Sequence, residues 1–344
     1  MPDRPLHLIP RSAPEIRVAI AGMGKMGQIH LSALNQLAAG GSERYYKGGI
    51  SELLAKLKVC GLCDIRPLNP ADYPNIELFN SVEVMLQQTQ PHFLIVATPT
   101  PAHKTIAMAA MSRGVHTLVE KPVVTAMADV NELLALAERS GVRLMAGHVE
   151  RYNPVSMKIK SLLGNAHLAA KRYAFRRIQR HDPRIADDII IDKVIHDLDL
   201  SLYFFGPIDQ VKVTHCRRCS GQIFEARLSL VHACGTHGEL FVSWLTEDAE
   251  KVRQVEIEQG GHCWKGDFAA KRLWVDGHEI QCVVPGWIEP ANNQIKDELV
   301  DFIAWCTEPT EGFTPAPLLT VQEMAESVRW LEYIHQSTET GVCR

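Results

Sequence analysis

The sequence has no long hydrophobic run and no excess of charge of one sign. Among its 344 residues, 36 Lys and Arg stand against 40 Asp and Glu, which gives a formal net charge of −4. A chain so near neutrality lacks the positive charge that neutralises a phosphate backbone or an anionic membrane surface. No stretch of about 18 apolar residues is present to cross a bilayer. We therefore expect neither a nucleic acid nor a membrane as a partner.

The N-terminus lacks the apolar core of a secretory signal, since four prolines interrupt its first 17 residues. Cysteine is also scarce, with nine residues scattered through a chain long enough to fold without disulfides. Cys60 and Cys63 have C-x-x-C spacing inside a strand-like run, where residues three apart point to opposite faces and do not share a metal. Cys216 and Cys219 have the same spacing with His215 beside them, so a zinc site is less firmly excluded there than at Cys60 and Cys63. We expect a cytoplasmic protein without a metal.

Apolar runs alternate with helix-period segments from residue 14 to about residue 148. Short continuous apolar runs are typical of parallel strands that are buried on both faces. The alternation predicts an α/β domain, over residues 1–148, built on a doubly wound parallel sheet. The expected strands are 16–21, 57–63, 93–97, 116–119 and 143–146, and the expected helices are 25–38, 82–88, 104–112 and 128–140.

Beyond residue 149 the pattern indicates a second domain, 149–344, of the α+β class. Helical patterns at 155–163 and 192–205 precede long runs of alternating hydrophobicity between residues 208 and 284, and two more helices, 292–306 and 320–335, follow. The alternating runs predict a large, open, mostly antiparallel sheet covered on one face. We expect the uncovered face to expose an apolar patch, and hence a homodimer or homotetramer.

A glycine-rich loop, Gly22-Met23-Gly24-Lys25-Met26-Gly27, lies between the first expected strand and the first helix. In this context G-x-G-x-x-G is typical of a dinucleotide site. Gly22 allows the tight turn, Gly24 lets backbone N–H groups approach a pyrophosphate, and Gly27 lets helix and strand pack closely. A bare match would more often be a turn, but the strand before it and the helix after it favour the cofactor.

The acidic residue expected to bind the adenosine ribose is Asp64, at the end of the second strand. It lies 37 residues after Gly27, so we interpret residues 40–55 as an insertion. An acidic side chain here binds two ribose hydroxyls and repels a 2′-phosphate, which points to NAD. Arg66 is able to pair with that phosphate instead, so NADP remains possible.

Five motifs together make the sequence resemble the Gfo/Idh/MocA oxidoreductases, related to glucose-fructose oxidoreductase and inositol dehydrogenase. They are the glycine loop, ATPTPAH at 97–103, VEKP at 119–122, AGHVERYNP at 146–154 and IDKVIHDLD at 191–199. The resemblance implies an N-terminal Rossmann domain and a C-terminal domain that binds substrate and forms oligomers. Residues it implies near the cofactor, besides the glycine loop, Asp64 and Arg66, are Thr98, Pro99, His103, Glu120, Lys121 and Pro122.

The resemblance also implies an acid/base group of Lys121, Asp192 and His196. Asp192 and His196 are four apart in a helical pattern, so both side chains should share one face, where the carboxylate orients the imidazole. An ammonium at Lys121 would polarise the reacting oxygen. The charged Lys193 and the bulky Val194 depart from the family pattern. We expect Asp197 and Asp199 on the helix surface or between the domains.

The string AGHVERYNP resembles the branch that acts on UDP-N-acetylhexosamines or uronates, and places His148, Arg151 and Asn153 at the substrate. Arg177 belongs to a basic run that offers guanidinium groups to an anion. A solvated sheet edge would explain that run nearly as well. The run consists of Lys171, Arg172, Arg176, Arg177, Arg180 and Arg184.

These residues predict an NAD(P)-dependent oxidoreductase that moves a hydride between nicotinamide and a secondary hydroxyl or ketone of a sugar. The predicted substrate is an anionic, nucleotide-linked sugar. One alternative is an NADPH-dependent reductase of a non-sugar carbonyl or imine, for which Arg66 is the best support. Another is a non-catalytic regulator that senses dinucleotides, although retention of Lys121, Asp192 and His196 argues against it.

Overall fold

The structure is a computed structural model that divides into two compact units. The first unit contains residues 1–149, with 286–288 and 293–324, and the second contains 150–285, 289–292 and 325–344. The residues that the structure describes are 6–40, 50–163, 170–183, 185, 187–246, 251–282, 293–309 and 317–339.

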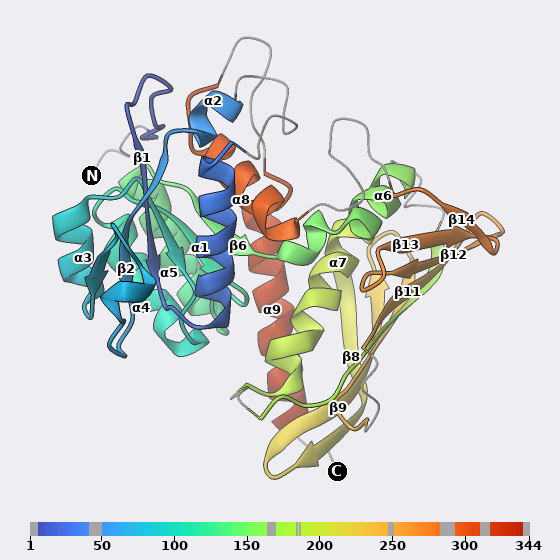
Figure 1. The fold of residues 1–344 in the computed structure, drawn as a ribbon. Helices are drawn as coiled ribbons and strands as arrows, with labels where there is room; N and C mark the ends of the chain where they lie inside the picture. Colours follow the sequence, from blue (N-terminus) through green and yellow to red (C-terminus); the bar gives the residue numbers. More distant parts are fainter. Residues whose placement is uncertain are drawn as a thin grey trace. The chain divides into compact units, whose positions relative to one another are not determined.

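The first unit is built on a six-stranded parallel sheet in the order β3-β2-β1-β4-β5-β6 (Figure 1). All five expected strands are present within one or two residues, which confirms the predicted doubly wound sheet. A sixth short strand, β3, and a short helix, α2, were not predicted. The strands are β1 (Ile16–Ala21), β2 (Leu57–Cys63), β3 (Glu77–Phe79), β4 (Phe93–Val96), β5 (His116–Glu120) and β6 (Leu144–Gly147).

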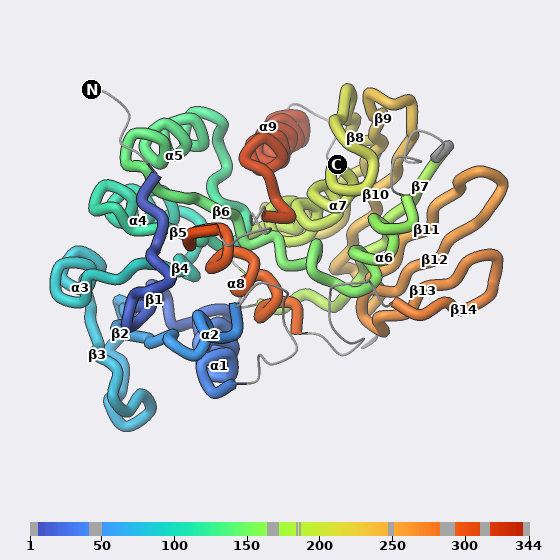
Figure 2. Tube along the Cα trace, turned by 90° about the horizontal axis from the view of Figure 1, so that it is seen from above, coloured from blue at the N-terminus to red at the C-terminus, as the bar shows by residue number. Residues whose placement is uncertain are grey.

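Helices cover both faces of this sheet, as the continuous apolar strands require. Helices α3, α4 and α5 lie along one face and α1 with α8 along the other (Figure 2). The expected insertion at 40–55 is described only at its ends, because residues 41–49 lie outside the described residues. The helices are α1 (Lys25–Ala38), α2 (Ile50–Leu54), α3 (Val82–Thr89), α4 (His103–Met111), α5 (Met127–Ser140) and α8 (Gln294–Trp305).

His116 is the first residue of β5 and is buried as a neutral ring at the amino end of this strand. Its Nδ1 accepts the Arg143 N–H at 2.9 Å, and its Nε2 lies 2.8 Å from the His7 carbonyl oxygen, to which it donates. Burial lowers the pKa of His116 from 6.5 to about 4. The unfolded chain therefore binds one proton more than the folded chain between these two pKa values.

We expect the free energy of unfolding to fall as the pH drops through this window. His116 alone accounts for a loss of about 2 kcal/mol between pH 7 and pH 5. Urea unfolding at the two pH values measures the loss. In His116→Asn, which keeps an acceptor for Arg143 but does not titrate, the loss should shrink by that amount. An unchanged pH dependence in the variant would contradict the assignment.

The second unit is built on an eight-stranded sheet in the order β14-β13-β12-β11-β7-β10-β9-β8. Only the β7–β10 pair is parallel, so the prediction of a large, mostly antiparallel sheet is confirmed. The strands are β7 (Ala170–Ile178), β8 (Ile208–Cys219), β9 (Gln222–His232), β10 (His237–Ser243), β11 (Val252–Gln259), β12 (His262–Asp267), β13 (Arg272–Val275) and β14 (His278–Ile280).

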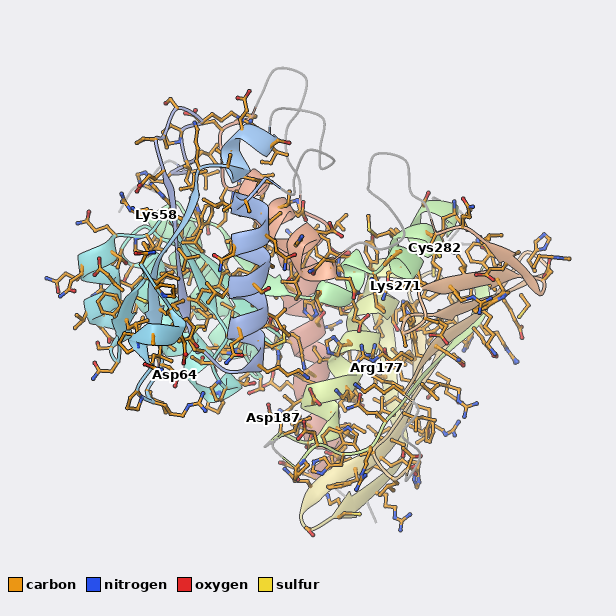
Figure 3. All side chains as sticks on the ribbon, in the orientation of Figure 1. Lys58, Asp64, Arg177, Asp187, Lys271 and Cys282 are labelled. Atoms are coloured by element: carbon orange, nitrogen blue, oxygen red, sulfur yellow. The ribbon has the colours of Figure 1, made fainter. Side chains whose placement is uncertain are left out.

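Helices α6 (Pro154–Leu163), α7 (Ile195–Phe205) and the second half of α9 (Val321–Ser337) pack on one face of this sheet. The hydrophobic core lies between these helices and the inward side chains of the strands, among them Phe175, Leu228 and Leu240. In Figure 3 the stick side chains on the strands project to both sides of the sheet.

The uncovered face of the sheet is charged, and the expected apolar patch is wrong for the described strands. Outward positions alternate with core positions and include Lys212, Arg217, Glu239, Glu256, Glu258 and Lys265, all exposed. The two large aromatic side chains on this face are covered by arginines. Arg227 lies 4.7 Å from the ring of Phe241, and Arg272 lies 4.8 Å from that of Trp274. The homo-oligomer therefore stays a prediction without this support.

Cys216 is disulfide-bonded, while Cys219 carries a free thiol. The chain, which we expected to be long enough to fold without disulfides, thus carries one at Cys216. The disulfide also removes Cys216 as a thiolate ligand for the zinc site that the spacing had left open. Among the helices of the described ranges, none combines the length and apolarity needed to span a bilayer.

Candidate functional site

The glycine loop follows β1 and opens α1, and two of its three glycines, Gly22 and Gly27, have a steric reason. Gly22 has φ +92°, and a Cβ there would lie 2.6 Å from the backbone of Ala97. A Cβ on Gly27 would lie 1.9 Å from the Gly22 carbonyl oxygen, so only glycine allows α1 to start this close to the turn. A Cβ on Gly24, in contrast, would meet nothing within 4 Å. Gly24 therefore faces open space at a helix N-terminus, where backbone N–H groups attract an anion.

Asp64 lies directly after β2 and is joined to the glycine loop. Its Oδ2 accepts the Met23 N–H at 2.8 Å, and its Oδ1 accepts the Arg66 N–H at 2.9 Å and Nε–H at 3.2 Å. Burial raises the pKa of Asp64, but the hydrogen bonds from Arg66 and Met23 lower it by a larger amount. The pKa of Asp64 therefore lies below its usual value. Asp64 is thus an anion beside the loop, and its carboxylate holds Arg66.

Glu120 and Lys121 lie at the carboxyl end of β5, the edge of a parallel sheet where ligands bind. The Lys121–Pro122 peptide bond is cis. Glu120 Oε1 lies 2.8 Å from His30 Nε2 of α1, and Glu120 Oε2 accepts the Lys121 N–H at 3.3 Å. Burial raises the pKa of Glu120, but the hydrogen bond from His30 and the charges of His30 and Lys121 bring it below its usual value.

His30 was not among the predicted site residues. A polar residue among Leu31, Leu34 and Leu37 on the buried side of a predicted helix is the signal that would have found it. Its side chain is completely buried, and it contacts a residue of the VEKP motif 90 positions away. The partner itself could not be inferred from spacing.

His103 was expected to line the nicotinamide or to cap the following helix. Its ring is 1% exposed and instead bridges two loops. Nδ1 lies 3.0 Å from the Pro122 carbonyl oxygen and Nε2 lies 2.8 Å from that of Thr98. The N-cap of α4 is Ala102, so the capping alternative is wrong. Thr98 Oγ1 is buried and has no hydrogen-bond partner among the described residues, while Pro99 is exposed at the same strand end.

In the second unit, Asp192 and His196 do not lie in one regular α-helix. Ile190–Val194 forms a π-helical turn, and His196 lies in the first turn of α7. The i, i+4 argument for a shared face therefore does not hold in its α-helical form, although π-helical turns occur often at functional sites. Lys193 Nζ lies 3.0 Å from Asp192 Oδ2 and supplies the carboxylate with a counter-charge.

Three predicted substrate ligands are engaged inside the second unit. Arg151 donates from Nε and Nη2 to Asp199, and Arg177 donates likewise to Asp197, with closest distances of 2.7 Å in both pairs. Asn153 donates to the Phe268 carbonyl and accepts the Val155 N–H, both at 3.0 Å.

The arginine–aspartate pairs overturn two expectations. Asp197 and Asp199 are each 1% exposed and pair with arginines of their own unit, so the prediction of a helix-surface position is wrong. The guanidinium groups of Arg151 and Arg177 are hydrogen-bonded to these carboxylates, so the argument that they bind an anionic substrate fails. Within the basic run, Arg172, Arg176 and Arg180 are exposed, whereas the Lys171 side chain and Arg184 lie outside the described residues.

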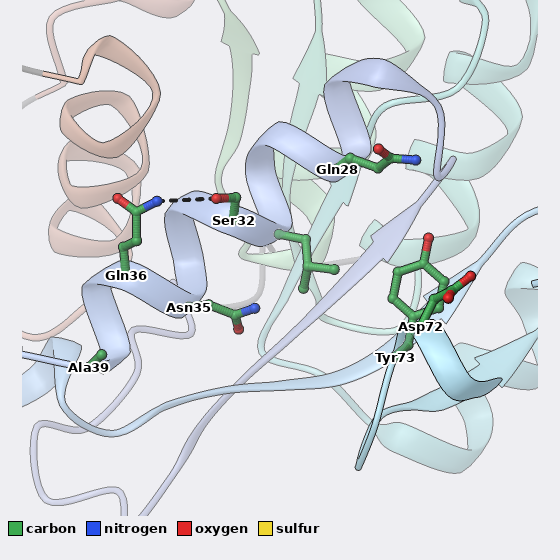
Figure 4. Close-up of a pocket in the computed structure, with 8 residues that line it drawn as sticks. Gln28, Ser32, Asn35, Gln36, Ala39, Asp72 and Tyr73 are labelled. Atoms are coloured by element: carbon green, nitrogen blue, oxygen red, sulfur yellow. Dashed lines mark hydrogen bonds between the residues drawn. The ribbon is translucent and has the colours of Figure 1, made fainter. Parts of the chain in front are cut away.

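A hollow of about 650 Å³ in the first unit lies along α1, from Gln28, the residue after the glycine loop, to Ala39 (Figure 4). It is bounded by the outer side of α1 and by Asp72 and Tyr73, and polar and apolar side chains both line it. Ser32 and Gln36 are hydrogen-bonded to each other on its wall at 3.1 Å. Since none of the predicted site residues lines it, we do not assign the hollow to the site.

The residues of the first unit fit a dinucleotide. Gly24 leaves room above a helix N-terminus for a pyrophosphate, the Asp64 carboxylate is placed for ribose hydroxyls, and Thr98 Oγ1 is a buried hydroxyl that lacks a partner among the described residues. A buried polar atom of this kind calls for a ligand or water. The fold and these residues define a dinucleotide-binding domain.

Comparisons with known proteins also indicate a dinucleotide-binding domain. Residues 16–148 match the sequence model of the oxidoreductase family with an NAD-binding Rossmann fold, Gfo/Idh/MocA. Residues 16–148 thus belong to the Gfo/Idh/MocA oxidoreductase family and form an NAD-binding Rossmann domain.

Named relatives include UDP-N-acetylglucosamine 3-dehydrogenase from Acidithiobacillus ferrooxidans, 29% identical over 201 residues, which are 56% of this chain and 56% of that protein. The chain thus matches little more than half the length of this curated relative. The solved structure of that dehydrogenase has a TM-score of 0.76 at 20% identity and covers 94% of this chain and 97% of its own.

The structure of the WlbA dehydrogenase from Bordetella pertussis, in complex with NADH and UDP-GlcNAcA, is also similar. Its TM-score is 0.74 at 18% identity, with 95% of this chain and 98% of that chain covered. At these identities the structural likenesses establish the fold over both units.

Proposed function

We propose that this protein is an NAD-dependent dehydrogenase that oxidises a secondary hydroxyl of a nucleotide-linked, anionic sugar. The observation that carries the proposal is the placement of Lys121 at the carboxyl end of β5 in a family of NAD-binding oxidoreductases. Relatives that act on or bind UDP-linked amino sugars support the substrate class.

Bound NAD would supply the hydride acceptor, the C4 atom of its nicotinamide ring. In this proposal His196 takes the hydroxyl proton as general base, and Asp192 orients its ring. The Lys121 ammonium polarises the same oxygen as negative charge develops on it. The hydroxyl carbon loses a hydride and the oxygen loses a proton, so that a ketone results.

The proposal is tested by incubating the purified protein with NAD and a panel of UDP-N-acetylhexosamines, UDP-uronates, free sugars and inositols. Absorbance at the NADH wavelength should rise with a UDP-sugar and rise much less with the free sugar. If only the free sugar reacts, the proposed substrate class changes from a nucleotide-linked sugar to a free sugar. If the protein shows no reaction and no shift in thermal stability with NAD or NADP, the proposal of a dehydrogenase is overturned.

Asp64 is expected to set the preference for NAD over NADP. The carboxylate is ionised and holds the Arg66 guanidinium, so a 2′-phosphate would meet a negative charge first. In Asp64→Ser, Arg66 is released to pair with that phosphate, and we expect the ratio of kcat/KM for NAD to that for NADP to fall at least about 30-fold, a change of about 2 kcal/mol. Steady-state kinetics with both dinucleotides measure the ratio.

Arg66→Ala serves as the matched control, because it removes the cation but keeps the carboxylate. It should leave the use of NAD nearly unchanged. The role of Asp64 would be contradicted if Asp64→Ser lost both dinucleotides to the same extent. That outcome would show that the Asp64–Met23 hydrogen bond only supports the loop.

A further inference from the structure

Lys121 lies between two residues that are each held by a buried histidine. On one side, Glu120 contacts His30 of α1, with Oε1 2.8 Å from Nε2. On the other side, the Pro122 carbonyl oxygen lies 3.0 Å from Nδ1 of His103, the first residue of α4. The two helices lie on opposite faces of the sheet, so the strand end is held from both faces.

Neither histidine is accessible enough to act on a ligand directly. His30 is 0% exposed and His103 is 1% exposed, whereas Lys121 is partly exposed. Any effect of the histidines on a reaction must therefore pass through the residues they hold. Such residues position a catalytic group and do not react themselves.

The contact from His30 reaches the Lys121 main chain through a single carboxylate. Glu120 Oε1 faces His30, and Oε2 accepts the Lys121 N–H at 3.3 Å. An ionised carboxylate only accepts hydrogen bonds, so His30 Nε2 is the donor. Without this donor a carboxylate that is 7% exposed would be left short of a partner, which favours its protonation or rotation. Either change weakens the bond to Lys121.

The backbone of Glu120 is held by its neighbour in the sheet. Gly147 pairs with Glu120 in the sheet, and a Cβ at Gly147 would lie 3.3 Å from the Glu120 Cα. His103 in turn bridges Pro122 to Thr98, which ties the end of β5 to the end of β4. Residues 120 and 122 are therefore fixed, and the main chain of Lys121 is fixed between them.

We propose that His30 and His103 are positioning residues that clamp the main chain on both sides of Lys121 and thereby aim its ammonium at the reacting oxygen. The proposal rests on the proposed function for the role of Lys121. The clamp itself is a property of the first unit alone and can be measured without substrate or dinucleotide.

The first experiment compares amide hydrogen exchange at single-residue resolution in the protein without ligands. His30→Gln keeps a donor near the position of Nε2, whereas His30→Asn places the donor one methylene short of Glu120. We expect exchange of the Lys121 amide to be at least tenfold faster in His30→Asn and near wild type in His30→Gln. The Thr117 amide of β5, which donates to the Arg143 carbonyl just before the neighbouring strand β6, should not change in either variant.

The second experiment measures kcat and KM with the substrate that the panel identifies. His30→Asn and His103→Leu should lower kcat at least tenfold. In His30→Asn the KM for NAD should stay within twofold of wild type, because the glycine loop, Asp64 and Thr98 are untouched. His30→Gln should restore most of kcat. The matched control is His116→Asn, a buried histidine at the opposite end of the same strand, which should keep kcat.

The outcomes separate the clamp from the proposed function. An unchanged Lys121 amide in His30→Asn, or a kcat within twofold of wild type in folded His30→Asn and His103→Leu, would overturn the clamp. Should His30→Asn fail to fold, a kcat in His103→Leu within twofold of wild type would overturn the clamp by itself. A wild-type protein that binds no dinucleotide and oxidises no substrate would overturn the proposed function, and the exchange result would stand by itself.

Discussion

Replacing His196 with Asn is expected to lower kcat by about 100-fold to 10,000-fold, the range that a positioned general base contributes. Asn retains a similar volume and a hydrogen-bonding group in the first turn of α7, but it cannot take up a proton. The ring lies in the second unit, whereas the glycine loop and Asp64 lie in the first. NADH should therefore bind to the variant as it does to the wild type. Turnover at saturating substrate, together with NADH fluorescence titration, measures both quantities.

Lys121→Met is expected to give a loss of similar size, because it removes the ammonium that stabilises the developing alkoxide while keeping the length of the chain. Matched controls are His237→Asn and Lys212→Met, two exposed residues of the uncovered sheet face. A kcat within threefold of wild type in His196→Asn would contradict the role of this residue as the base. Another group would then have to take the hydroxyl proton.

The fold of the first unit could be predicted almost residue by residue, because local sequence decides it. Buried parallel strands require continuous apolar runs, and β1 and β2 begin and end where the runs do. β3 was not predicted, since its three residues carry too little pattern. The π-helical turn at Ile190–Val194 was not predicted either, because the sequence has the same apolar spacing as the regular helix that follows.

The candidate site was less predictable, because tertiary structure, and not local sequence, decides which partner a charged side chain has. Arg177 and Asp197 are 20 residues apart, and nothing local shows that their charges meet in the interior of the second unit. A basic run looks the same whether alternate residues point outward, as Arg176 does, or inward, as Arg177 does. The glycine loop was predictable because its motif, and the steric contact between Gly27 and Gly22, lie within six residues.

The same steric constraint separates two glycine substitutions that sequence alone would treat alike. In Gly27→Ala the new Cβ would lie 1.9 Å from the Gly22 carbonyl oxygen, a backbone atom that cannot move without opening the turn. We expect the free energy of unfolding to fall by about 3 kcal/mol or more, and NADH binding to be lost. In Gly24→Ala the Cβ meets nothing within 4 Å, so the fold should be kept.

Gly24→Ala should nevertheless lower the affinity for NADH about 100-fold, because the Cβ occupies the space through which the pyrophosphate approaches the backbone N–H groups. Urea unfolding and NADH fluorescence titration, run on both variants, measure stability and affinity separately. Ser32→Ala, an exposed change on the same helix, is the control and should alter neither. If Gly24→Ala bound NADH like the wild type, the pyrophosphate would not lie against this loop, and the assignment of the glycine loop to the cofactor would be wrong.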